Sequence, residues 1–155
     1  MQMKKTLFYC AIAVLVLSCE GNLRKKAEQS MNTEVLRDRK KYTLIQWQDS
    51  IVNFGTIKEG EKALVRFRFK NTGNYPLYLV NVHAGCGCTL VSYSQGSIPP
   101  DREGEVTGEF DSNRSYPGEV RKTIVVTTNT RNNMQHTLIF TGAVRGVGDD
   151  VSNTY

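Results

Sequence analysis

The sequence lacks the features on which large enzymes, membrane channels and disulfide-rich secreted proteins depend. Its 155 residues suffice for one ordinary domain, so a large multidomain enzyme is excluded. Its longest apolar run, residues 6–18, rises about 20 Å as a helix against roughly 30 Å of bilayer hydrocarbon, so a permanent membrane-spanning helix is not expected. Hydrophobic residues make up 39% and charged residues 23%, values typical of a globular protein and not of a disordered chain.

The excess of positive charge lies outside the part of the chain that is predicted to fold. The formal net charge is +5, but positions 42–155 hold eleven Lys and Arg against eleven Asp and Glu. A nucleic-acid-binding domain keeps its excess basic residues on the docking surface, because counterion release supplies the affinity. We therefore predict no nucleic-acid partner.

The first nineteen residues have the order of an export signal. Lys4 and Lys5 precede the apolar run, and Cys19 follows it directly. The end of the run, Val16-Leu17-Ser18-Cys19, resembles a bacterial lipobox, which implies that Cys19 is lipidated and becomes the mature N-terminus. We predict a lipoprotein signal peptide over residues 1–18 and a lipid-anchored protein at the cell envelope, in a leaflet that the sequence leaves open; ordinary secretion is the alternative.

The predicted processing leaves the mature domain with one pair of cysteines. Cys10 would leave with the signal peptide and Cys19 would carry lipid, so Cys86 and Cys88 remain. Without a long-range disulfide framework, the domain must rely on its own hydrophobic core. We read residues 19–41 as a polar basic tether and residues 149–155 as a flexible tail.

Between residues 42 and 148 the hydrophobic pattern has the period of a β-strand. Val65, Phe67 and Phe69 alternate with Arg66, Arg68 and Lys70, which is typical of a half-buried strand in an antiparallel sheet. Turn-forming residues separate this strand from other short apolar segments, and no helical period lies between them. We predict an all-β, immunoglobulin-like β-sandwich of about seven antiparallel strands, with Trp47 placed before the first. The expected strands are 51–54, 64–70, 77–83, 89–93, 105–110, 120–128 and 137–144.

Several segments in this region resemble a bacterial family, domain of unknown function 1573. They are Phe54 to Glu61, Phe69 to Leu77, Cys86-Gly87-Cys88-Thr89, and Gly118 to Asn129, within a match of about residues 50–144. The resemblance implies an immunoglobulin-like sandwich, commonly on exported lipoproteins, and brings no established activity. The chain departs from the family in the turn 99–104, where Pro-Gly is usual, and at Ala84-Gly85, where Ser is common.

The Cys86-Gly87-Cys88 motif is the one constellation with chemical potential beyond packing. Strand positions two apart point the same way, so the two sulfurs can converge on each other or on one ligand. Three interpretations stay open: two packed cysteines, a disulfide of low structural value, and a soft metal site in which His83 adds a nitrogen. Copper is favoured over zinc for such a site, because zinc wants four ligands and three are at hand.

No arrangement typical of a hydrolase is present. The serines lack a nucleophile-elbow context, and the paired acids lie at turns or termini. We therefore expect a non-catalytic interaction or structural module that binds an envelope protein and requires no cofactor. The alternative is a thiol-dependent redox or copper-binding protein that uses Cys86, Cys88 and His83.

Overall fold

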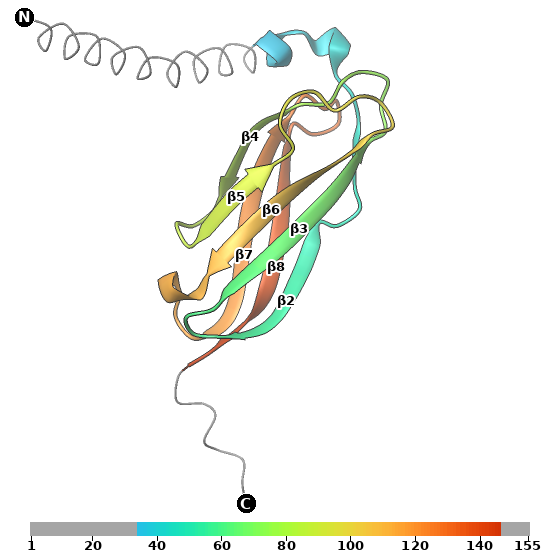
Figure 1. The fold of residues 1–155 in the computed structure, drawn as a ribbon. Coiled ribbons are helices and arrows are strands. Elements are labelled where there is room, and N and C mark those ends of the chain that lie inside the picture. The colour runs from blue at the N-terminus through green and yellow to red at the C-terminus, as the bar shows by residue number, and fades with distance from the viewer. Residues whose placement is uncertain (1–33, 147–155) are drawn as a thin grey trace, which may run out of the picture. The chain divides into compact units, whose positions relative to one another are not determined.

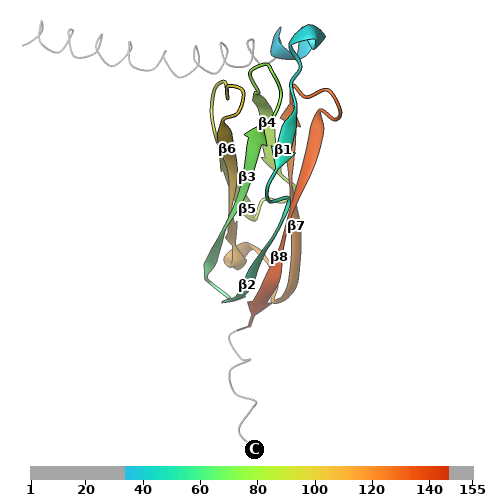
Figure 2. The same cartoon turned by 90° about the vertical axis from the view of Figure 1, so that its right-hand side faces the viewer.

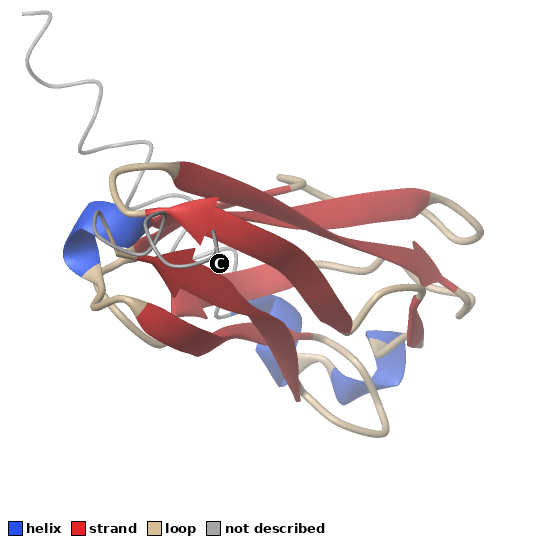
Figure 3. Cartoon of the chain, turned by 90° about the horizontal axis from the view of Figure 1, so that it is seen from below, coloured by secondary structure: helices blue, strands red, loops and turns tan. Residues whose placement is uncertain are grey.

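The computed structural model describes residues 34–146, which contain eight β-strands in two four-stranded sheets (Figures 1 and 2). The first sheet has the order β1-β3-β6-β5 and the second the order β2-β8-β7-β4, and Figure 3 shows the loops gathered at the ends of the strands. The bounds are β1 Ile45–Trp47, β2 Ile51–Lys58, β3 Lys62–Asn71, β4 Leu79–Ala84, β5 Thr89–Tyr93, β6 Glu103–Asp111, β7 Gly118–Thr128 and β8 Gln135–Arg145. The predicted all-β sandwich is confirmed.

Strand β3 shows how the alternating sequence builds this architecture. Val65, Phe67 and Phe69 are buried, and the residues between them face solvent. The buried face meets the second sheet: the rings of Phe110 in β6 and Phe140 in β8 lie 6.0 Å apart, across the interface between the layers. Burial of one such ring stabilises the fold by about 1.5–3 kcal/mol, so the large apolar residues of both sheets supply the cohesion.

The first strand differs from the prediction, because it is divided between the two sheets. Ile45–Trp47 pairs antiparallel with β3, and the chain then crosses to the second sheet, where β2 runs parallel to β8. Trp47 is thus part of a strand, and its ring lies 5.1 Å from that of Phe69. A three-residue strand is too short to show a period of two, and β2 contains a register shift at Gly55, whose φ of 79° breaks the alternation.

The unusual turn between residues 99 and 104 has a local explanation. Asp101 has a φ of 62°, in the left-handed region that glycine adopts at little cost and that Asp tolerates better than most residues. Its backbone N–H donates to Asn71 O at 2.9 Å, so the turn is tied to the end of β3. The departure from the usual Pro-Gly turn therefore leaves the fold intact.

Two short helical segments precede the sandwich. Residues 34–37 form one helical turn, and Arg39–Lys41 form the 3-10 helix η1, whose first turn is capped by the Asp38 carboxylate. The chain divides into two units between Arg37 and Asp38. Within residues 34–146, no helix combines the length and apolar character needed to cross a membrane. The predicted signal peptide, Cys19 and the C-terminal tail lie outside the described residues.

Candidate functional site

The Cys86-Gly87-Cys88 motif lies where the chain crosses from the second sheet to the first, between β4 and β5. A disulfide joins the two cysteines, whose Cα atoms are 5.3 Å apart. Of the three interpretations that the sequence left open, this is the arrangement in the structure; the sulfurs are not free thiols.

Hydrogen bonds to both sheets hold the crossing. Gly85 N donates to Thr123 O of β7 at 2.8 Å, and Asp111 N of β6 donates to Cys88 O at 2.9 Å. A Cβ at position 85 would lie 2.6 Å from Thr123 Oγ1, so the chain approaches β7 more closely than a side chain permits. The crossing is therefore positioned by the backbone on either side of the disulfide.

The two cysteines of the disulfide differ in exposure as residues. Cys88 is buried, with 6% of its surface exposed, whereas Cys86 is half-buried and Gly87 is exposed. A Cβ at Gly87 would meet no atom within 4 Å, so space is open on this side of the turn. Solvent and other molecules therefore approach the disulfide from the side of Cys86.

Two polar side chains lie against the disulfide turn. The Thr89 hydroxyl is 3.6 Å from Cys86 Sγ and 3.9 Å from Cys88 Sγ. Arg114, in the 3-10 helix η2 (Ser112–Arg114) that follows β6, donates from Nη1 to Gly87 O at 2.9 Å. The turn thus has a hydroxyl beside both sulfurs and a guanidinium on its exposed carbonyl.

The structure does not bring His83 into a metal site. His83 is exposed in β4, opposite Val125 of β7, while its neighbour Val82 is buried. In the part of the chain that the structure describes, no group of three or more His, Cys, Asp or Glu side chains is arranged to hold a metal ion. Coordination by Cys86 and Cys88 would first require reduction of the disulfide, because metals bind the thiolate.

The opposite end of the sandwich is organised by two buried asparagines. Asn71 donates from Nδ2 to Tyr75 O and Ile98 O, and its Oδ1 accepts from Thr43 Oγ1 and Gly73 N. The oxygen and the nitrogen of the Asn71 side-chain amide are therefore both fully hydrogen-bonded, as a buried polar side chain requires.

The second of these asparagines, Asn129, makes the same kind of bridge. Its Oδ1 accepts from Tyr78 N at 2.8 Å, and its Nδ2 donates to Pro76 O at 3.0 Å. The family-like segments Phe69 to Leu77 and Gly118 to Asn129 thus each contain an asparagine that ties loops together.

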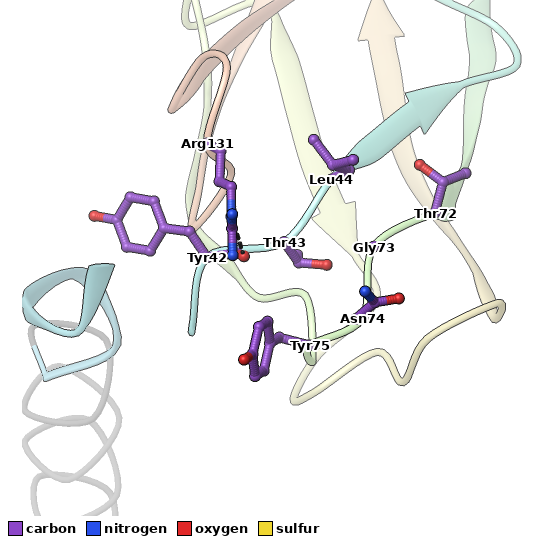
Figure 4. A pocket seen from close by; sticks show the side chains of 8 residues that line it. All are labelled: Tyr42, Thr43, Leu44, Thr72, Gly73, Asn74, Tyr75 and Arg131. Carbon is purple, nitrogen blue, oxygen red and sulfur yellow. Dashed lines mark hydrogen bonds between the residues drawn. The ribbon is translucent and has the colours of Figure 1, made fainter. Parts of the chain in front are cut away.

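A shallow pocket of about 170 Å³ opens at this asparagine end (Figure 4). Its wall includes Arg131, which donates from Nε to Tyr42 O at 2.9 Å and from its backbone N–H to Thr43 O at 3.2 Å. None of the lining residues is a histidine, cysteine or carboxylate. The lining residues are Tyr42, Thr43, Leu44, Thr72, Gly73, Asn74, Tyr75 and Arg131.

Sequence reasoning found the cysteines but missed the residues around them. Thr89 directly follows Cys88 in the motif, and that adjacency was a usable signal. Arg114 is 27 residues from Gly87, and nothing in the sequence connects the two. The tertiary structure alone places its guanidinium at the turn.

Comparisons with known proteins agree with the fold and leave the activity open. The model of the family described as Protein of unknown function (DUF1573) matches residues 45–144. No curated protein matches the chain. The structure of a protein of unknown function from Porphyromonas gingivalis W83 is 13% identical with a TM-score of 0.59, over 66% of this chain and 47% of that one, so this chain spans about half of that protein's length.

Two further solved structures have the same fold at low identity. PapD-like domain 7 of human CEP192 is 14% identical with a TM-score of 0.52, over 69% of this chain and 87% of that one. The VesB protease of Vibrio cholerae is 12% identical with a TM-score of 0.53, over 64% of this chain and 31% of that one. At such identities the likeness concerns the fold, and function does not follow from it.

Proposed function

The chain belongs to the DUF1573 family, and from that premise we propose that it is an exported, lipid-anchored interaction module at the bacterial cell envelope. Its partner is an envelope protein that contributes an extended segment. A family without an assigned activity and a PapD-like sandwich both fit a non-catalytic module.

The open edge of β5 is the observation that carries the proposal. Among the described residues, β5 pairs only with β6. The bonds Asp111 N to Cys88 O and Ser94 N to Glu105 O place the hydrogen-bonded positions at even residue numbers. The backbone N–H and C=O groups of Thr89, Val91 and Tyr93 therefore point away from β6. Tyr93 O accepts from Gln95 Nε2 at 3.4 Å, and an added strand can pair with the groups of Thr89 and Val91.

Exposed apolar side chains lie beside this edge. Leu90 of β5 and Leu64 of β3 stand opposite Glu109 of β6, one on each side, on the outer face of the first sheet. They are 67% and 56% exposed. An incoming strand would gain main-chain hydrogen bonds from β5 and apolar contact with Leu90.

Export is supported by the disulfide and by the sequence. Disulfides persist outside the reducing cytosol, so a Cys86–Cys88 bond is consistent with an extracytoplasmic domain. The lipobox-like end of the apolar run supplies the anchoring cysteine, Cys19.

Envelope fractionation with a radiolabelled fatty acid tests the anchoring. We expect label on the wild-type chain and none on Cys19→Ala, which moves to the soluble fraction. An unlabelled wild-type chain, or a Cys19→Ala chain that stays in the membrane fraction, contradicts the anchor.

Cross-linking in cells tests the open edge. Val91→Pro removes an outward N–H while the ladder to β6 keeps its bonds, and proline is tolerated on edge strands. We expect Val91→Pro to lose the cross-linked partner and the control Val91→Thr, which keeps the N–H, to retain it. Equal cross-linking by both variants contradicts strand addition at β5.

A second candidate function rests on the disulfide itself. The two cysteines differ in exposure as residues and both sulfurs lie near the Thr89 hydroxyl. While the pair is oxidised, this arrangement favours thiol chemistry over copper binding.

A further inference from the structure

We propose that the Cys86–Cys88 disulfide is a thiol–disulfide exchange site that oxidises an accessible dithiol of another protein. An incoming thiolate attacks Cys86 Sγ, and Cys88 is the leaving sulfur. The site lies in the crossing between β4 and β5 and does not depend on partner binding at the β5 edge.

The disulfide contributes little to holding the fold. It closes a loop of three residues, and the entropy that a cross-link removes from the unfolded chain falls as its loop shortens. The crossing is already tied to β7 through Gly85 and to β6 through Cys88. The bond can therefore open and close while the sandwich stays assembled.

The unequal exposure of the two cysteine residues favours attack at Cys86. Cys86 is half-buried beside the open space at Gly87, and Cys88 is buried under the turn at 6% exposure. Access to the sulfur is one of the factors that set the rate of exchange. An incoming thiolate therefore reaches Cys86 Sγ first.

The surroundings of the disulfide favour departure of a sulfur as a thiolate. The Thr89 hydroxyl, 3.6 Å from Cys86 Sγ and 3.9 Å from Cys88 Sγ, can donate a hydrogen bond to the thiolate that forms on either sulfur. The Arg114 guanidinium, held on Gly87 O at 2.9 Å, adds a positive charge to the turn. Asp111 is the acid nearest to Arg114 in the sequence, and its carboxylate accepts from Asn113 N at 3.0 Å and caps η2. A lower thiol pKa makes a better leaving group, and nearby cations lower it.

The exchange takes two steps, the formation of a mixed disulfide and its resolution. In the first, the partner's thiolate forms a bond to Cys86 Sγ, the Cys86–Cys88 bond breaks, and Cys88 leaves with the electron pair as a thiolate. In the second, the partner's other thiolate attacks its own sulfur in the mixed disulfide, and Cys86 leaves as a thiolate. The partner is oxidised to a disulfide, this chain is reduced by two electrons, and the two thiolates take protons from water.

A mapping experiment on the mature full-length chain tests the order of attack. The oxidised protein is exposed to glutathione, quenched with a fast alkylating reagent and sequenced by tandem mass spectrometry. We expect glutathione on Cys86 and the alkyl group on Cys88, in about tenfold excess over the reverse pattern. Equal patterns, or no adduct on the folded protein, overturn the proposal.

Rate measurements with a dithiol peptide test the role of Thr89. We expect Thr89→Val to slow oxidation of the peptide by about fivefold, the effect of one lost hydrogen bond. The matched control is Thr107→Val, which removes a hydroxyl bonded to Ser92 on the outer face of the sheet. Both variants must melt like the wild-type chain, and equal rates for the two overturn the assignment.

Two further comparisons complete the test. The dithiol peptide should be converted to its disulfide at one equivalent per chain, and the Cys86→Ser/Cys88→Ser variant should oxidise none of it. The reduced chain should stay folded, with a Tm within about 10 °C of that of the oxidised chain. Unfolding on reduction would show that the bond is structural and the proposal wrong.

Discussion

The two ends of the sandwich are held by different chemistry. At one end the buried amides of Asn71 and Asn129 bridge loops that are far apart in the sequence. At the other end a covalent bond joins residues only two positions apart. The strand register places these regions at opposite ends, since Thr89 follows the disulfide and aligns through Phe110 with Ala63, whereas Asn71 ends β3.

This difference separates a structural device from a chemical one. Asn71 satisfies four polar groups that would otherwise be buried without partners, so its contribution to stability is large. The disulfide spans a short loop and constrains the unfolded chain weakly. The noncovalent end is therefore expected to contribute more to stability than the disulfide does.

The largest expected effect on stability comes from removing the side-chain amide of Asn71. Asn71→Ala leaves Tyr75 O, Ile98 O and the Thr43 hydroxyl without their partner, and we expect a loss of about 3–4 kcal/mol in the free energy of unfolding. Urea denaturation measures it. Asn74→Ala, an exposed amide in the same turn, is the control and should change stability by less than about 0.5 kcal/mol. Similar losses for the two variants would remove the special role of Asn71.

Glycine substitutions sharpen the contrast between the ends. A Cβ at Gly73 would lie 2.5 Å from the backbone nitrogen of Leu44, whereas a Cβ at Gly87 would meet no atom within 4 Å. We expect Gly73→Ala to cost about 2–3 kcal/mol through overpacking and Gly87→Ala to stay within about 0.5 kcal/mol. Thermal melts of both variants decide it, and a destabilised Gly87→Ala would show that the disulfide turn is as tightly packed as the asparagine end.

Removal of the disulfide should cost less than removal of the asparagine amide. For a loop of three residues the chain-entropy relation gives about 1.6 kcal/mol, so Cys86→Ser/Cys88→Ser should lose roughly half of what Asn71→Ala loses. Urea denaturation of the oxidised wild-type chain and the variant measures the difference. A loss of about 4 kcal/mol or more in the free energy of unfolding would reverse the assignment of roles to the two ends.

The smallest expected effect is a pH dependence at the asparagine end. Burial lowers the pKa of His136, which lies between the hydroxyls of Thr128 and Thr130, below its ordinary value of 6.5, and a hydrogen bond with the Asn133 backbone offsets part of this. The unfolded chain takes up a proton as the pH falls below 6.5 while the folded chain resists it, so stability decreases on acidification and levels off below the folded pKa.

The measurement is urea denaturation at a series of pH values between 5 and 8, and His136→Gln should remove this component of the slope. His83→Gln, on the exposed face of β4, is the control for substitution of a histidine. A wild-type chain that gains stability on acidification through this range, with the gain removed by His136→Gln, would contradict the sign.

Sequence patterns predicted the regular parts of the fold and failed where the chain is irregular. Val65, Phe67 and Phe69 indicated a half-buried strand because each side chain on one face meets the same environment. The three residues of β1 were too few to show that period, and the parallel pairing of β2 with β8 leaves no mark in the local sequence. Trp47 was consequently placed outside the sheet.

The candidate site was half predictable for a similar reason. The Cys-Gly-Cys spacing located Cys86 and Cys88. Whether two such cysteines form a disulfide, stay separate thiols or bind a metal depends on the path of the turn between them. That path is fixed by Thr123 and Asp111, on strands that are distant in sequence. Arg114 reaches the turn through the same tertiary arrangement.

The sequence by itself determined the all-β class, because alternation along a strand is a local property of side-chain order. Only the tertiary structure decided the division of the first strand, the joining of Cys86 and Cys88 in a disulfide, and the unequal exposure of these two residues. Each of these depends on atoms contributed by segments far apart in the chain, and a local pattern contains no information about their distance.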